Sequence, residues 1–136
     1  MLNDPKTVST PDRHRLIPHT TLSTFKVENA AQENLGTLHD IVLDVVSGKI
    51  VYGILSYGGF LGLGDRHLAI PWSRLAVDEV NQRILVNIER ETLENSPEYD
   101  HENPPDISDP SWGSKVHDHF GAPPYWIGEG PATALI

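Results

Sequence analysis

The sequence contains no cysteine, few basic residues and no long apolar run. Without cysteine the chain cannot form disulfides, thiolate metal sites or a cysteine nucleophile. Its 10 Lys and Arg residues are outnumbered by 19 Asp and Glu, and the net charge of −9 argues against nucleic acid, because phosphate binding needs clustered cations. No stretch approaches the roughly 18 apolar residues that span a bilayer, and residues 1–12 lack the apolar segment of a signal peptide. We therefore expect a cytoplasmic protein without a membrane span.

Proline divides the 136 residues into a centre and two ends. Ten of the eleven prolines lie outside residues 19–96, and proline is poorly tolerated inside helices and inner strands. This distribution predicts one folded domain over 19–96, preceded by a flexible N-terminal segment at 1–18. Residues 97–136 form an acidic, proline-rich C-terminal extension.

The centre is predicted to consist of short strands joined by turns. Runs rich in β-branched residues alternate with turn residues, and Ser47-Gly48-Lys49 separates two such runs as a hairpin turn would. Six short strands in so short a domain indicate a small barrel or curled sheet. The expected strands are 24–28, 37–46, 50–56, 67–72, 75–78 and 83–88.

The extension carries a strong helix signal over residues 110–120. Asp109 suits the N-cap, Pro110 suits the first helical position, and Gly121 can adopt the left-handed conformation that ends a helix. Apolar residues recur every four positions within this segment and form one stripe, which we expect to dock on the barrel. The expected docking residues, including two aromatics after the helix, are Trp112, Val116, Phe120, Tyr125 and Trp126.

The strand at 50–55 is apolar on both faces, so burying one face alone leaves large side chains in water. The second face must be covered by a docked tail or by a partner subunit. The loop that follows carries three large apolar residues, which either fold back or meet another chain. These features predict an interaction patch made of Val51, Leu55, Tyr57, Phe60, Leu61 and Leu63.

Familiar catalytic and ligand-binding motifs are missing from the sequence. The glycine-rich loop GGFLGLGDR lacks the Lys and the Ser or Thr of a phosphate-binding loop. Asp40 and Asp44 share a face of one strand about 13 Å apart, too far for a close acid–base pair. Because no nucleophile, base and orienting group can be named together, we expect no enzymatic activity and no cofactor.

The seven histidines do not predict a metal site. His117 and His119 are two residues apart on the expected helix, where only neighbours three or four apart face each other. His39 and His67 lie on separate expected strands, and neither has an identifiable third ligand nearby in the sequence. We interpret these histidines as surface or capping residues and expect no metal.

Residues 35–88 resemble the PRC-barrel family. The shared features are a glycine followed by an apolar and acidic strand with Asp40 and Asp44, the SGKI turn, the YGILSYGG strand, the FLGLGD loop and the AIPW segment. The C-terminal W…VHDHFG…YW pattern is similar to tails of stand-alone bacterial members. The resemblance implies a small β-barrel like that of the photosynthetic reaction-centre H subunit and of ribosome maturation factors. In those settings the barrel mostly binds other proteins, and the family shares no catalytic residues.

We therefore expect an all-β fold, a PRC-type barrel of about six short strands with a C-terminal α-helix packed against it. The expected role is a non-catalytic protein-interaction module that self-associates, most simply as a homodimer. Two alternatives stay open. One is a small-molecule or metal-binding domain at the barrel rim near Asp65, His67 and Trp72. The other, an accessory subunit of a photosynthetic or respiratory membrane complex, depends on the family resemblance alone.

Overall fold

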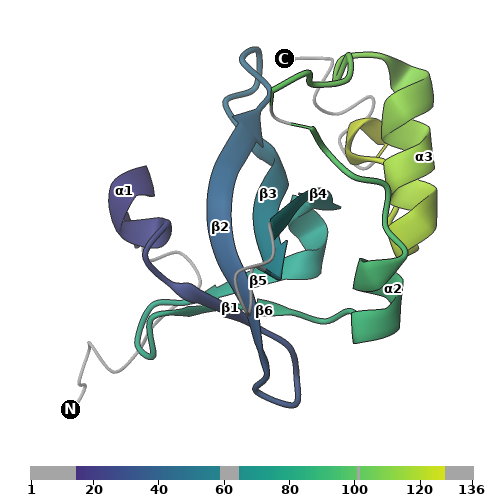
Figure 1. The fold of residues 1–136 in the computed structure, drawn as a ribbon. Coiled ribbons are helices and arrows are strands. Elements are labelled where there is room, and N and C mark those ends of the chain that lie inside the picture. Colours follow the sequence, from purple (N-terminus) through teal and green to yellow (C-terminus); the bar gives the residue numbers. More distant parts are fainter. Residues whose placement is uncertain (1–14, 59–64, 101, 128–136) are drawn as a thin grey trace.

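The computed structural model describes residues 15–58, 65–100 and 102–127, and its centre is one curled six-stranded sheet (Figure 1). The strand order across the sheet is β4-β3-β2-β1-β6-β5. The strands are β1 (Lys26–Glu28), β2 (Asn34–Leu43), β3 (Ile50–Gly58), β4 (Asp65–Pro71), β5 (Leu75–Asp78) and β6 (Arg83–Val86). The helical elements are α1 (His19–Leu22), the 3-10 turn η3 (Trp72–Arg74), α2 (Arg90–Glu94) and α3 (Pro110–Phe120). An all-β fold of six short strands with a C-terminal helix is thus confirmed.

Strands β2 and β3 form the long hairpin of the sheet, with Leu43 opposite Ile50. The turn between them is closed by Asp44, whose carboxylate accepts from the backbone N–H of Val46 at 3.0 Å. The Gly48 N–H donates to the Asp44 carbonyl at 2.7 Å, and Gly48 has a φ of 77°. Strand β2 therefore ends at Leu43, earlier than the expected boundary at residue 46. Beyond Leu43, the backbone N–H of Val46 donates to the Asp44 side chain and not to a neighbouring strand.

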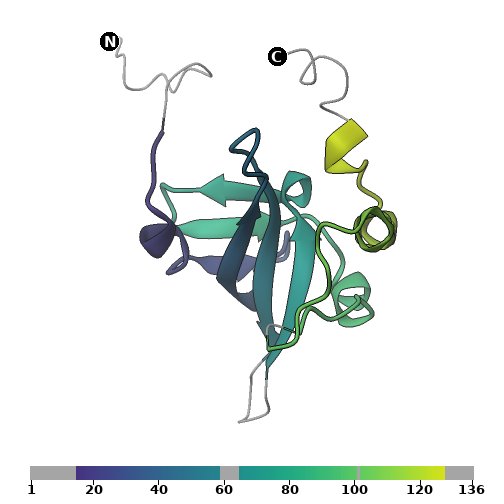
Figure 2. The same ribbon diagram turned by 90° about the horizontal axis from the view of Figure 1, so that it is seen from above.

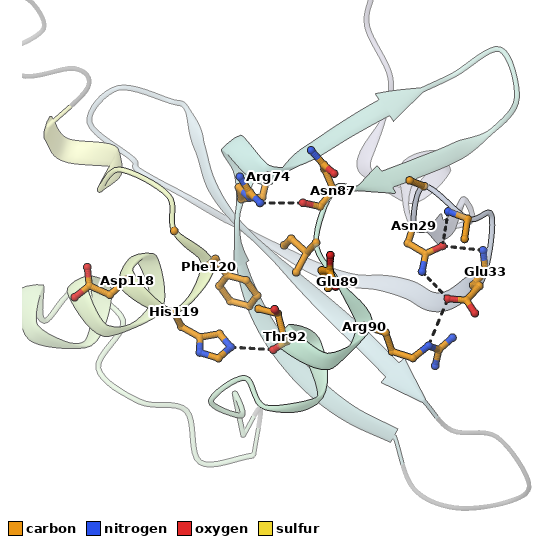
Figure 3. Close-up of a pocket in the computed structure, with 14 residues that line it drawn as sticks. Asn29, Glu33, Arg74, Asn87, Glu89, Arg90, Thr92, Asp118, His119 and Phe120 are labelled. Atoms are coloured by element: carbon orange, nitrogen blue, oxygen red, sulfur yellow. Dashed lines mark hydrogen bonds and ion pairs between the residues drawn. The ribbon is translucent and has the colours of Figure 1, made fainter.

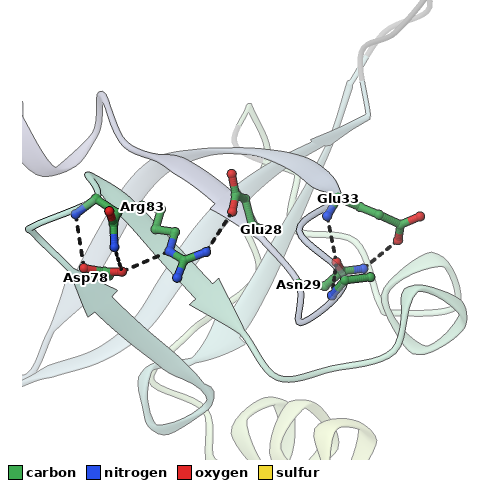
Figure 4. Close-up of polar contacts among 7 residues, drawn as sticks. Glu28, Asn29, Glu33, Asp78 and Arg83 are labelled. Carbon is green, nitrogen blue, oxygen red and sulfur yellow. Dashed lines mark hydrogen bonds and ion pairs between the residues drawn. The ribbon is translucent and has the colours of Figure 1, made fainter.

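The two halves of the curled sheet join where β1 pairs in parallel with β6, placing Val27 opposite Ile84. The Arg83 guanidinium holds this junction together, since it contacts the Asp78 carboxylate at 3.0 Å and the Glu28 carboxylate at 3.3 Å (Figure 4). A hydrogen bond from the Asn81 side chain, followed by one from Arg83, lowers the pKa of Asp78 to about 2. The ion pairs thus link the β5–β6 hairpin to β1, which is more than 45 residues away in the sequence.

The core fills the concave side of the curled sheet. Gly53 of β3 faces this side, because a Cβ there would meet the side chains of Leu75, Leu38 and Trp72. Side chains two residues apart in a strand share a face, so the alternate residues of β3 also point inward. The central core side chains, all buried, are Val27, Leu38, Leu55, Ile70 and Ile84.

Helix α3 packs beside the sheet against β4, and Figure 2 shows it end-on at one side of the curl. Its boundaries are those that the sequence predicts. The Asp109 carboxylate accepts from the Ser111 backbone N–H at 3.0 Å, and Gly121 ends the helix with a φ of 63°. Both caps satisfy backbone groups that a helix end would otherwise leave without partners.

The chain that leads from the sheet to α3 is tied along strand β4. Arg66 binds the Glu98 carboxylate at 2.8 Å and donates to the carbonyls of Glu94 and Ser96 at 2.9 and 3.0 Å. The Tyr99 N–H donates to the His67 carbonyl at 2.6 Å. These bonds cover part of an edge strand that would otherwise offer unpaired backbone groups to another chain.

Candidate interaction surface

Three members of the expected interaction patch lie inside the molecule. Val51, Leu55 and Tyr57 are buried members of the core cluster, and Leu55 and Tyr57 share the inward-facing side of β3 with Gly53. The prediction that these side chains meet a partner is wrong, because the concave face of the sheet already encloses them. The other three members, Phe60, Leu61 and Leu63, lie outside the described residues.

The second face of β3 is covered by the chain's own C-terminal extension. Tyr52 points to that side and is 1% exposed. Its ring centroid lies 5.2 Å from that of Trp112 and 6.0 Å from that of Tyr125. Val116 and Phe120 are buried in the same core cluster. The sequence predicts that either a docked tail or a partner subunit covers this face, and in the structure the docked tail does so.

Trp126, the last expected docking residue, is 37% exposed and packs with one edge against α3. Its indole lies 5.6 Å from the His117 ring, centroid to centroid. It also borders Gly113, where a Cβ would come within 3.0 Å of the Trp126 ring and 3.1 Å of the Tyr52 hydroxyl oxygen. The missing side chain at this glycine therefore allows α3 to approach β3 closely.

His117 occupies a position that differs from the one its sequence context predicts. It is 1% exposed, whereas a surface or capping position was expected. Its Nδ1 donates to the Gly113 carbonyl at 2.8 Å, which sets the tautomer. The signal was available, since His117 follows Gly113 by one helical turn and the glycine leaves space beside the Trp112 and Val116 stripe. His119 differs, as its Nε2 donates to the Thr92 carbonyl at 2.9 Å and so links α3 to α2.

Three exposed apolar side chains lie at the end of the β2–β3 hairpin. Leu43 is 48% exposed, Val45 89% and Val46 93%. We call Leu43, Val45 and Val46 the hairpin tip. The sequence analysis placed these residues within an expected strand, and their exposure follows from the early end of β2. Valines this exposed gain free energy when a partner removes them from water.

A pocket of about 680 Å³ lies between α2, α3 and the turn after β1, and its lining is polar and of mixed charge (Figure 3). The Arg90 guanidinium lies 3.5 Å from the Glu33 carboxylate. A hydrogen bond from Asn29 and the charge of Arg90 lower the pKa of Glu33. Arg74 donates to the Asn87 carbonyl at 2.9 Å. These charged groups are thus paired with one another or with the backbone.

The residues named for a rim site, Asp65, His67 and Trp72, all belong to strand β4 or to the turn that follows it. Asp65 begins strand β4, and Trp72 follows the strand's last residue, so they are separated by about 20 Å along an extended chain. His67 instead packs against His39, with ring centroids 4.4 Å apart. Within residues 15–58, 65–100 and 102–127, no group of three or more candidate metal ligands occurs.

The curled sheet and its covering helix define a small β-barrel domain with a helical C-terminal extension. The chain matches the family model of the PRC-barrel domain over residues 8–93, more than half of its length. It therefore belongs to the PRC-barrel domain family, as the resemblance of residues 35–88 indicated. A comparison with curated proteins gives no match. Among the described helices, none has the length and apolar character needed to cross a bilayer.

Proposed function

We propose that this PRC-barrel protein is a non-catalytic protein-interaction module that associates with a second copy of itself through the hairpin tip. PRC-barrel domains are generally protein-interaction modules. The single observation that supports this surface is the exposure of Val45 and Val46, at 89% and 93%, on a turn that the Asp44 side chain orders. An ordered turn presents these side chains with little conformational entropy left to lose.

The charge of the chain predicts opposite salt dependences for a second copy and for a basic partner at the hairpin tip. Each copy carries a net charge of −9, so two copies repel each other at long range, and added salt weakens that repulsion. An apolar contact between copies should therefore strengthen as salt is added. A basic partner would be attracted by the same charge and would bind more weakly in salt. The sign of the salt dependence separates these two kinds of partner.

Sedimentation of the full chain over roughly 10 µM to 1 mM tests the proposal, since interfaces of this small size are weak. The wild type is expected to dimerise, more tightly at high salt, and Val46→Asp is expected to stay monomeric. Val80→Asp is the matched control, because Val80 is 85% exposed on a different turn and carries the same substitution. A wild type that stays monomeric, or a control that dissociates equally, would contradict self-association through the tip.

A further inference from the structure

We propose that the pocket between the N-terminal segment and the end of the barrel binds small apolar carboxylates. This site is separate from the hairpin tip and goes beyond the proposed interaction role. It has a volume of about 220 Å³ and is lined by residues of α1, of the segment before it, and of β2, β3, η3 and β5. Six apolar side chains line it, namely Ile17, Leu22, Ile41, Ile50, Trp72 and Val77.

The size of the pocket sets the size of the ligand body. An engineered apolar cavity of about 150 Å³ in another protein binds benzene, and this pocket is larger. It therefore accommodates a single aromatic ring with a short side chain, or a branched aliphatic group of similar volume. The lining offers water few hydrogen-bond partners, so an apolar group displaces that water favourably.

The rim of the pocket supplies the charge preference. Arg15, His19 and Glu79 lie at the rim, and the Arg15 guanidinium contacts the Glu79 carboxylate at 3.1 Å. These two side chains are 59% and 33% exposed, and exposed ion pairs contribute only about 0–1 kcal/mol. A ligand carboxylate can therefore take the place of Glu79 on Arg15 at little cost and gain a bidentate contact.

The rim favours a carboxylate over an amine. Arg15 carries a permanent positive charge and His19 adds a ring N–H donor, whereas Glu79 is the single acid among the described residues that line the pocket. An ammonium group finds one acceptor there, the Glu79 carboxylate, whereas a carboxylate can accept from both Arg15 and His19. A ligand with a carboxylate on an apolar body thus matches both the charged rim and the apolar lining of the pocket.

Phenylacetate is a suitable probe, and the indole N–H signals in a nitrogen–proton NMR spectrum of the full chain provide the readout. The chain has three tryptophans, and Trp72 alone lines this pocket, so Trp112 and Trp126 are internal controls. Phenylacetate at up to about 10 mM should shift the Trp72 signal, because a ligand of ten heavy atoms is expected to bind with a Kd near 1 mM. Acetate and benzylamine should shift it far less at the same concentration.

Arg15→Gln is expected to weaken phenylacetate binding about tenfold, the usual effect of losing a charge-assisted hydrogen bond. Lys115→Gln is the matched control, because it removes one positive charge from the exposed side of α3 and should leave the affinity unchanged. Arg15→Glu should invert the preference toward benzylamine. The proposal is overturned if Trp72 does not respond, if benzylamine binds the wild type equally well, or if Arg15→Gln and Lys115→Gln bind phenylacetate alike.

Discussion

Replacing Gly113 by alanine tests how closely α3 approaches the sheet. The helix interior by itself favours alanine over glycine by about 1 kcal/mol. In this molecule a Cβ at Gly113 would lie 3.0 Å from the Trp126 ring and 3.1 Å from the Tyr52 hydroxyl oxygen. The indole of Trp126 is partly exposed and can move aside, whereas Tyr52 is enclosed by the sheet and the helix.

The balance of these two effects gives the expected magnitude. Overpacking a buried contact costs about 1–3 kcal/mol, which exceeds the gain in helix propensity. Gly113→Ala is therefore expected to lower the free energy of unfolding by about 0–2 kcal/mol. Ser114→Ala, on the same helix, lacks this clash and should stabilise the protein by about 0.5 kcal/mol or less. Urea unfolding followed by tryptophan fluorescence measures both values.

Tyr52→Phe identifies the cause of the clash. The Tyr52 hydroxyl is buried and finds no hydrogen-bond partner among the described residues, so its removal should be neutral or stabilise the protein by up to about 1 kcal/mol. In the double variant Tyr52→Phe/Gly113→Ala, the alanine should stabilise the protein by most of the amount that helix propensity predicts. A double-mutant cycle detects this difference as a coupling free energy between the two positions. If Gly113→Ala alone stabilises by the full propensity value of about 1 kcal/mol, the close approach of α3 to Tyr52 is refuted.

Three further predictions address other parts of the fold. Gly36→Ala should prevent folding to the native sheet, as judged by circular dichroism, because Gly36 has a φ of 138° and a Cβ there would overlap the Ser56 carbonyl; a native spectrum would contradict this. Asn81→Ala should raise the pKa of Asp78 from about 2 toward its ordinary value in an NMR titration. Because this pKa is depressed in the folded state, its stabilising effect is present above about pH 4 and is lost as the pH falls toward 2; an unchanged pKa would refute the role of Asn81. Val116→Asp should release α3 and expose the outer face of β3, which dye binding and aggregation would report, and a soluble, dye-negative variant would contradict that cover.

The sequence predicted local structure best where short-range chemistry decides it. The ends of α3 follow from Asp109, Pro110 and Gly121, each of which acts on backbone groups within a few residues. The end of β2 was misplaced for a related reason. Asp44 is a turn residue, and with its bond to the Val46 N–H the strand ends three residues earlier than the β-branched run suggests.

Tertiary arrangement was harder to predict. The apolar character of both faces of β3 correctly implied a cover, but it could not distinguish the chain's own helix from a partner. The parallel pairing of β1 with β6 joins residues more than 50 positions apart, and no local pattern indicates it. His117 is surrounded by the rings of Tyr52, Tyr125 and Trp126, which come from separate parts of the chain. The pocket beside Trp72 is lined in part by the N-terminal segment.

The central claim is that the hairpin tip is the surface through which this protein contacts a partner copy. Amide chemical shifts of residues 43–49, followed as the full chain is diluted from high concentration, test it most directly. Shifts that change with concentration, saturate as a monomer–dimer equilibrium and grow with added salt are the predicted result. Shifts at the tip that stay constant while another surface responds, or while no residue responds, would contradict the claim.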